Sequence, residues 1–127
     1  MSNKVEDVSH GRRIWLAAGC VGFAAIVVLS LVPRDYRPHT GVSGLAEHFA
    51  AYLLVAYAFG RWSPSWRQVF KIAAAMAVAS ALLEVFQTWV PGRNPEVLGS
   101  LFSSAGAFAG AWIAIRLHNS PGPDRPH

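Results

Sequence analysis

The sequence predicts an all-α polytopic membrane protein with four transmembrane helices, and two observations support this prediction. Of the 127 residues, 53% are hydrophobic and only 14% are charged, whereas a soluble domain of this size buries only about 60 to 70% of the surface that its unfolded chain exposes. The apolar residues also fall into four blocks separated by short polar stretches, as expected of helices that cross a bilayer. Lipid is therefore the expected solvent for most of the chain.

The first two blocks follow a polar N-terminal segment, residues 1–13. Residues 14–32 carry no charge and match the length of about 20 residues that crosses the hydrocarbon core. The second block, residues 45–60, contains Glu47 and His48 near its start, so it would insert only marginally by itself. We expect it to be a span because the rest of this block is almost wholly apolar.

The third and fourth blocks are residues 69–90 and 97–117. A Pro-Gly pair directly after the third block is expected to end its helix, and the fourth block carries no charge until its last residues. Residues 118–127 form a polar, proline-rich tail. The sequence therefore predicts one membrane domain, residues 14–117, between two polar segments.

The lysine and arginine residues predict the orientation of the chain. Eight of them lie before the first span, around the turn between the second and third spans, or at the end of the fourth: Lys4, Arg12, Arg13, Arg61, Arg67, Lys71, Arg116 and Arg125. The other three lie in the two remaining loops: Arg34, Arg37 and Arg93. By the positive-inside rule both termini are expected in the cytoplasm. Because these cations are scattered and form no dense patch, a nucleic-acid partner is not expected.

This topology brings polar residues of the second and third helices to the same depth near the outer surface. His48 and Tyr52 are four residues apart, and Glu84 and Gln87 are three apart, so each pair shares one face of its helix. A carboxylate exposed to lipid costs on the order of 2.5 to 3.5 kcal/mol, so Glu84 is expected to face a cavity or a partner. With Arg93 in the following loop, the sequence predicts an outward-facing polar pocket lined by these five residues.

Two further features allow more than one interpretation. Cys20 follows Leu-Ala-Ala-Gly, as in a lipoprotein cleavage site, but it lies too close to Arg13 for a signal peptide, which favours a small residue within a membrane helix. Gly106 and Gly110 form a GxxxG pair, which allows close helix packing within the bundle or a homo-oligomer. Packing within the bundle is favoured.

The sequence favours binding over catalysis. It contains no array of cysteine and histidine ligands, no glycine-rich phosphate loop and no recognisable nucleophile motif, so neither a metal nor another cofactor is expected. His48 and Glu84 could still serve acid–base chemistry. An intramembrane enzyme that acts on a lipid-linked substrate therefore stays an alternative, as does an oligomeric membrane scaffold.

Taken in order, the motifs of residues 26–110 resemble the VanZ-like family of membrane proteins. They are an apolar helix ending in Leu-Ser-Leu-Val-Pro, then His48-Phe-x-x-Tyr52, then Glu84-x-x-Gln87 followed by Val-Pro-Gly-Arg93, and a glycine-rich last helix. Four positions depart from the family pattern. Gly44 and Leu45 stand where the family usually has Asp-Lys, and Gly99 and Ser103 stand where it has Asp and Asn, which further favours binding over a shared chemistry.

The resemblance implies a small protein of the bacterial cytoplasmic (inner) membrane, and the family's namesake is associated with resistance to the glycopeptide teicoplanin. We therefore expect a pocket that binds an envelope lipid, an envelope precursor or a glycopeptide antibiotic. Glu84 would be its anion, His48 and Tyr52 would face that anion, Gln87 would add a hydrogen-bonding group, and Arg93 would contact an anionic head group at the mouth.

Overall fold

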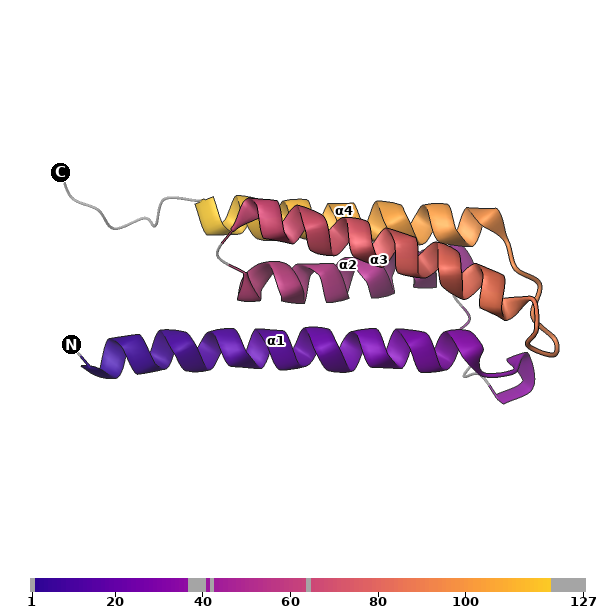
Figure 1. Ribbon diagram of the computed structural model, residues 1–127, viewed down its shortest axis with the longest axis horizontal. Helices are drawn as coiled ribbons and strands as arrows, with labels where there is room; N and C mark the ends of the chain where they lie inside the picture. The colour runs from indigo at the N-terminus through magenta and orange to yellow at the C-terminus, as the bar shows by residue number, and fades with distance from the viewer. Residues whose placement is uncertain (1, 37–40, 42, 64, 120–127) are drawn as a thin grey trace.

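The computed structural model describes residues 2–36, 41, 43–63 and 65–119. Within these ranges the chain forms four α-helices and one short 3-10 helix (Figure 1). They are α1 (Ser2–Leu31), η1 (Arg34–Tyr36), α2 (Gly44–Trp62), α3 (Trp66–Gln87) and α4 (Val97–Asn119). The all-α prediction is confirmed. Arg37 and residues 120–127 of the predicted polar tail lie outside the described residues.

Among the described helices, α1, α3 and α4 are long and apolar enough to cross a membrane. Large apolar side chains are exposed along them, among them Val21, Leu82, Leu101 and Trp112, and such a surface suits hydrocarbon better than water. α2 is shorter and is not one of the three. Three of the four expected spans are thus helices that could cross a membrane by length and composition, which is consistent with a multi-pass membrane protein.

α3 ends at Gln87, before the apolar block itself ends at Val90. Directly after this helix, three successive amides each donate to the carbonyl three residues back, at 3.1 Å, so the backbone tightens as it leaves the helix. Pro91 and Gly92 then form the centre of a turn, which a 3.2 Å backbone hydrogen bond from Arg93 closes. Gly92 has a φ of 72°, which a residue with a Cβ rarely adopts.

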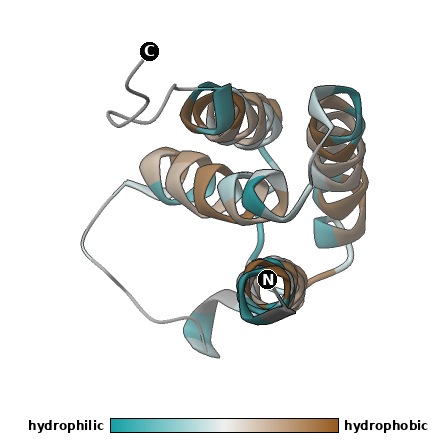
Figure 2. Cartoon of the chain, turned by 90° about the vertical axis from the view of Figure 1, so that its left-hand side faces the viewer, coloured by the Kyte–Doolittle hydropathy of each residue, from teal (hydrophilic) through white to brown (hydrophobic). Residues whose placement is uncertain are grey.

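The helices alternate in direction, so α1 and α3 run one way and α2 and α4 the other (Figure 1). α2 is central because it packs against all three other helices, and its contact with α4 is the most extensive in the bundle. Seen end-on, α1 lies beside α2 on the side away from α4 (Figure 2). One end of the bundle therefore collects the last turns of α1 and α3 and the first turns of α2 and α4.

α2 and α4 approach closely because glycines on α4 leave room for the backbone of α2. A Cβ at Gly106 would overlap the carbonyl oxygen of Phe49, and one at Gly110 would overlap that of Leu53. The GxxxG pair thus packs inside the chain, which is the use that its sequence favours. Homo-oligomerisation through the same pair stays a prediction, and within one chain α2 covers both glycines.

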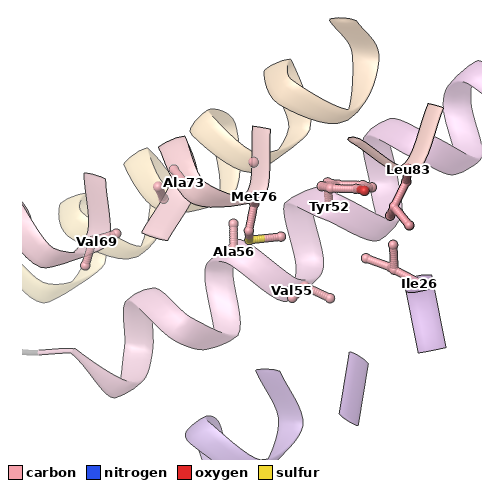
Figure 3. Packing of buried hydrophobic residues seen from close by; sticks show 10 residues of the cluster. Ile26, Tyr52, Val55, Ala56, Val69, Ala73, Met76 and Leu83 are labelled. Carbon is pink, nitrogen blue, oxygen red and sulfur yellow. The ribbon is translucent and has the colours of Figure 1, made fainter. Parts of the chain in front are cut away.

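The apolar core lies along the middle of the bundle. Figure 3 shows Met76 of α3 close to Ala56 of α2, with Tyr52 and Leu83 farther along toward the end at which α3 finishes. Ile26 is the buried member of this cluster that comes from α1. Small side chains bring α2, α3 and α4 together here, and the core gives way to polar groups beyond Tyr52.

α1 joins the bundle through glycines and through one polar contact at its N-terminal half. A Cβ at either glycine would lie 2.8 Å from an α2 side chain: Gly19 faces Phe59, and Gly22 faces Val55. Nearer its N-terminus, Arg12 Nε donates to the carbonyl oxygen of Trp62 at 3.0 Å. That carbonyl belongs to the last residue of α2, where no donor within the helix is left for it.

Gly110→Ala should destabilise the bundle, whereas Gly11→Ala should not. The new methyl group at position 110 must displace the backbone of α2, and overpacking of this kind costs about 1 to 3 kcal/mol. At Gly11 nothing lies within 4 Å of the added Cβ, and alanine is the better helix former. Thermal unfolding of both variants in mild detergent checks this expectation, and equal midpoints for the two would contradict it.

Candidate functional site

Buried polar side chains gather at the end of the bundle where α1 and α3 finish. Ser30, Ser80, Gln87 and Ser103 are all buried, and they come from α1, α3 and α4. The first turn of α2 completes this end. Ser43 precedes α2, and its hydroxyl accepts from the Ala46 amide at 3.3 Å, which is a favourable start for a helix.

A hollow of about 290 Å³ opens at this end of the bundle, and we call it the polar hollow. Its wall comes from the start of α2, the end of α3, the following loop and the start of α4: Gly44, Leu45, His48, Glu84, Gln87, Gly92, Arg93, Asn94, Glu96 and Gly99. The structure thus brings four of the five predicted pocket residues together: His48, Glu84, Gln87 and Arg93.

Glu84 lies over the first turn of α4. Its Oε2 atom accepts a hydrogen bond from the Glu96 amide at 2.9 Å, and Glu96 directly precedes α4. The N-terminal end of a helix attracts negative charge, so this position suits a carboxylate. The other oxygen, Oε1, lies 2.7 Å from the point where a Cβ at Gly99 would be.

His48 faces the same point from α2. Its Nδ1 atom lies 3.2 Å from Ser103 Oγ, and Ser103 is completely buried in α4. Its Nε2 atom lies 3.8 Å from the position of a Cβ at Gly99. Because residue 99 has no side chain, Glu84 Oε1 and His48 Nε2 can both lie close to the backbone of α4 at this position.

Gln87 and Arg93 line the polar hollow, but they also hold the end of α1. Gln87 Nε2 donates to Ser30 O at 3.1 Å. Arg93 donates from Nε to Val32 O at 3.2 Å and from its terminal nitrogen to Leu29 O. The last carbonyls of a helix have no partner within it, so these two side chains supply the missing donors.

Tyr52 lies deeper than the polar hollow and is not part of its wall. Its side chain is only 2% exposed, and its hydroxyl forms a hydrogen bond with Ser80. Ser80 Oγ lies 3.5 Å from Ser100 Oγ, which continues this contact to α4. Tyr52 was predicted to line the pocket, but the structure places it in the apolar core cluster, close to Leu83 (Figure 3).

The charges around Glu84 oppose each other. Arg93 attracts its carboxylate and Glu96 repels it. No group of three or more His, Cys, Asp or Glu side chains that could hold a metal ion occurs in the described part of the chain. The groups present can accept hydrogen bonds, donate them and attract a cation.

Three residues that lie next to Glu84 or His48 were not among the predicted pocket residues: Glu96, Gly99 and Ser103. In the sequence, Gly99 and Ser103 stand out only as departures from a family pattern. A signal for Glu96 exists, because an acidic residue directly before an apolar helical block is typical of a helix start. No sequence rule connects Ser103 with His48 across 55 positions.

Comparisons with protein-family models, with curated proteins and with solved structures find no match. The resemblance to the VanZ-like family therefore stays a prediction from the sequence pattern. The site described above is defined by its own geometry.

Arg93→Ala should loosen the end of α1, and Gln87→Leu should do the same. Each change leaves carbonyls of the last turn without donors, and an unsatisfied backbone group costs about 1 to 3 kcal/mol. Hydrogen exchange measured over residues 28–36 should become faster in both variants, since local opening precedes exchange. Arg67→Ala is the charge-matched control, because Arg67 is exposed on α3 near the opposite end of the bundle. Equal exchange in Arg93→Ala and Arg67→Ala would contradict the anchoring role.

Proposed function

We propose that this chain is a VanZ-like protein of the bacterial cytoplasmic membrane that binds the polar head of an amphiphile in its polar hollow. The observation that carries this proposal is the polar hollow itself, a space of about 290 Å³ whose wall includes Glu84, His48 and Gly99. The ligand class comprises envelope lipids, envelope precursors and glycopeptide antibiotics. Binding without chemical conversion is the proposed activity.

The positions at which this chain departs from the VanZ-like pattern also support the proposal. Gly44, Leu45 and Gly99 line the polar hollow, and Ser103 contacts His48 from behind it. Positions scattered over 60 residues of sequence thus surround one site. Such clustering is expected if these positions set what the pocket accepts.

The helix directions support four spans and an outward-facing hollow. α1 and α3 run the same way (Figure 1), so if both cross the membrane, α2 must return the chain between them. With the termini in the cytoplasm, as the positive-inside rule predicts, the end that carries the polar hollow faces outward. An amphiphile in the outer leaflet would then have its head group at the depth of Glu84.

Glu84→Gln and Gly99→Val should each abolish retention of the native ligand. The first removes the charge, and hydrogen bonds to charged groups contribute about 1.5 to 3 kcal/mol, or roughly tenfold to hundredfold in affinity. The second places a side chain where Glu84 Oε1 now lies, so it displaces the carboxylate. Because the new Cβ meets the end of a flexible side chain, the fold should survive. Intact-mass spectrometry of gently solubilised protein measures the adduct.

Ser104→Ala is the matched control for this measurement. Ser104 bonds within α4, to Ser100 O at 2.8 Å, and does not line the polar hollow. It should retain the ligand at the wild-type level. A wild-type protein without any adduct, or an adduct that survives Glu84→Gln unchanged, would sink the proposal.

An intramembrane enzyme is the second candidate, and one contact favours it. Ser103 contacts the His48 ring at Nδ1 and so orients this ring in the wall of the polar hollow, and a general base needs such a fixed orientation. His48→Gln would then stop turnover of labelled membrane lipids by the purified protein while leaving the retained ligand in place. Chemically intact lipids after incubation with wild-type protein would exclude this candidate.

A further inference from the structure

A second hollow lies next to the polar hollow, on the surface formed by α3 and α4, and we call it the apolar groove. Its volume is about 400 Å³. Its wall comes from the last two turns of α3, from the residues just before α4 and from the first turn of α4: Ala81, Glu84, Val85, Thr88, Pro95, Val97 and Ser100. Glu84 belongs to the walls of both hollows, so its carboxylate separates a polar space from an apolar one.

The apolar groove opens on the surface that lipid would cover. Val85 is 54% exposed and Val97 is 79% exposed. Ala81 lies one helical turn before Val85 and is exposed as well, so the groove follows one face of α3. Between positions 81 and 88 it extends over about 10 Å, at the helical rise per residue. An acyl chain that lies along α3 would fit this shape.

The charges of the polar hollow favour a cationic head group. Its wall holds the carboxylates of Glu84 and Glu96 against one guanidinium, that of Arg93, and Arg93 already donates to the end of α1. Within the described part of the chain, no hydrogen bond reaches Glu84 Oε1. An ammonium group would supply both the donor and the positive charge that this oxygen requires.

We propose that the site takes a single-chain membrane amphiphile with an amine head group, which enters from the bilayer between α3 and α4. Its acyl chain lies in the apolar groove, and its ammonium group lies in the polar hollow at Glu84. This inference rests on the proposed function, because it names the ligand class of the same pocket. Glu84 is the residue at which the chain and the head group diverge.

The acyl chain raises the local concentration of the head group more than it adds contact energy. Lipid tails are as apolar as the groove, so moving a tail from the bilayer into the groove contributes little by itself. A tail nevertheless holds the head group in the membrane, at the depth of Glu84, and thereby raises its local concentration. A free head group has to reach the same carboxylate from water, where the ammonium is fully hydrated.

Three probes separate the contributions of head group and tail. They are lysophosphatidylethanolamine, lysophosphatidylglycerol with the same acyl chain, and glycerophosphoethanolamine without a chain. Titration of the full chain in nonionic detergent, read by native mass spectrometry, should show lysophosphatidylethanolamine binding at least tenfold more tightly than either of the others. Glu84→Gln should remove this preference over lysophosphatidylglycerol.

Val85→Trp tests whether the acyl chain lies in the apolar groove, with Val78→Trp as its matched control. Both valines are exposed on α3, by 54% and 60%, but only Val85 lines the groove. Val85→Trp should weaken lysophosphatidylethanolamine binding at least tenfold, while Val78→Trp should bind as the wild type does. A lysophosphatidylethanolamine with a photoreactive acyl chain should label residues 81–100 in the wild type.

Each part of the proposed binding mode has a result that would contradict it. Equal binding of the two lysophospholipids would overturn the amine head group, and equal binding of glycerophosphoethanolamine would overturn the role of the tail. Equal effects of the two tryptophan variants would overturn the placement of the acyl chain in the apolar groove. If wild-type protein bound none of the probes, the ligand class would be wrong, while an adduct from native membranes lost in Glu84→Gln would still uphold the proposed function.

Discussion

The carbonyl groups at the end of a helix need donors from outside the helix, and this requirement organises the end of the bundle that carries the polar hollow. The last carbonyls have no partner within the helix itself. Gln87 and Arg93 provide donors to the end of α1, and Arg12 provides one to the end of α2. A guanidinium suits this task because it carries several donors in a rigid fork. Polar side chains thus fix the helix ends, while glycine contacts fix the middle of the bundle.

The hydrogen bonds to the end of α1 divide the polar residues of the site into two groups. Gln87 and Arg93 are engaged by the backbone of α1, so they shape the wall of the polar hollow rather than await a ligand. Glu84 and His48 are held by groups of the chain, Glu84 by the Glu96 amide and His48 by the Ser103 hydroxyl, and both side chains line the polar hollow. Groups that are fixed before a ligand arrives lose little freedom on binding.

The sequence predicted the depth of the site but not its hydrogen-bond partners. The fixed rise of a helix places His48 and Glu84 at the same end of the bundle once the helices alternate in direction. The contact between Gln87 and Ser30 joins residues 57 positions apart, and it depends on how the helices rotate about their axes, which hydropathy does not record. Tyr52 shares a helix face with His48, but it lies one helical turn farther into the bundle. Its side chain is therefore in the core and not in the wall of the polar hollow.

The small residues of α4 show how one sequence pattern serves two purposes. Gly99, Ser103, Gly106 and Gly110 lie along one buried stripe. At the last two glycines the neighbour is the backbone of α2, which cannot yield, whereas at Gly99 it is the end of the Glu84 side chain. Close packing therefore holds α2 against α4 at Gly106 and Gly110, whereas the missing side chain at Gly99 leaves room for the Glu84 carboxylate. The boundary lies at Ser103, which is fully buried yet uses its hydroxyl to orient the ring of His48.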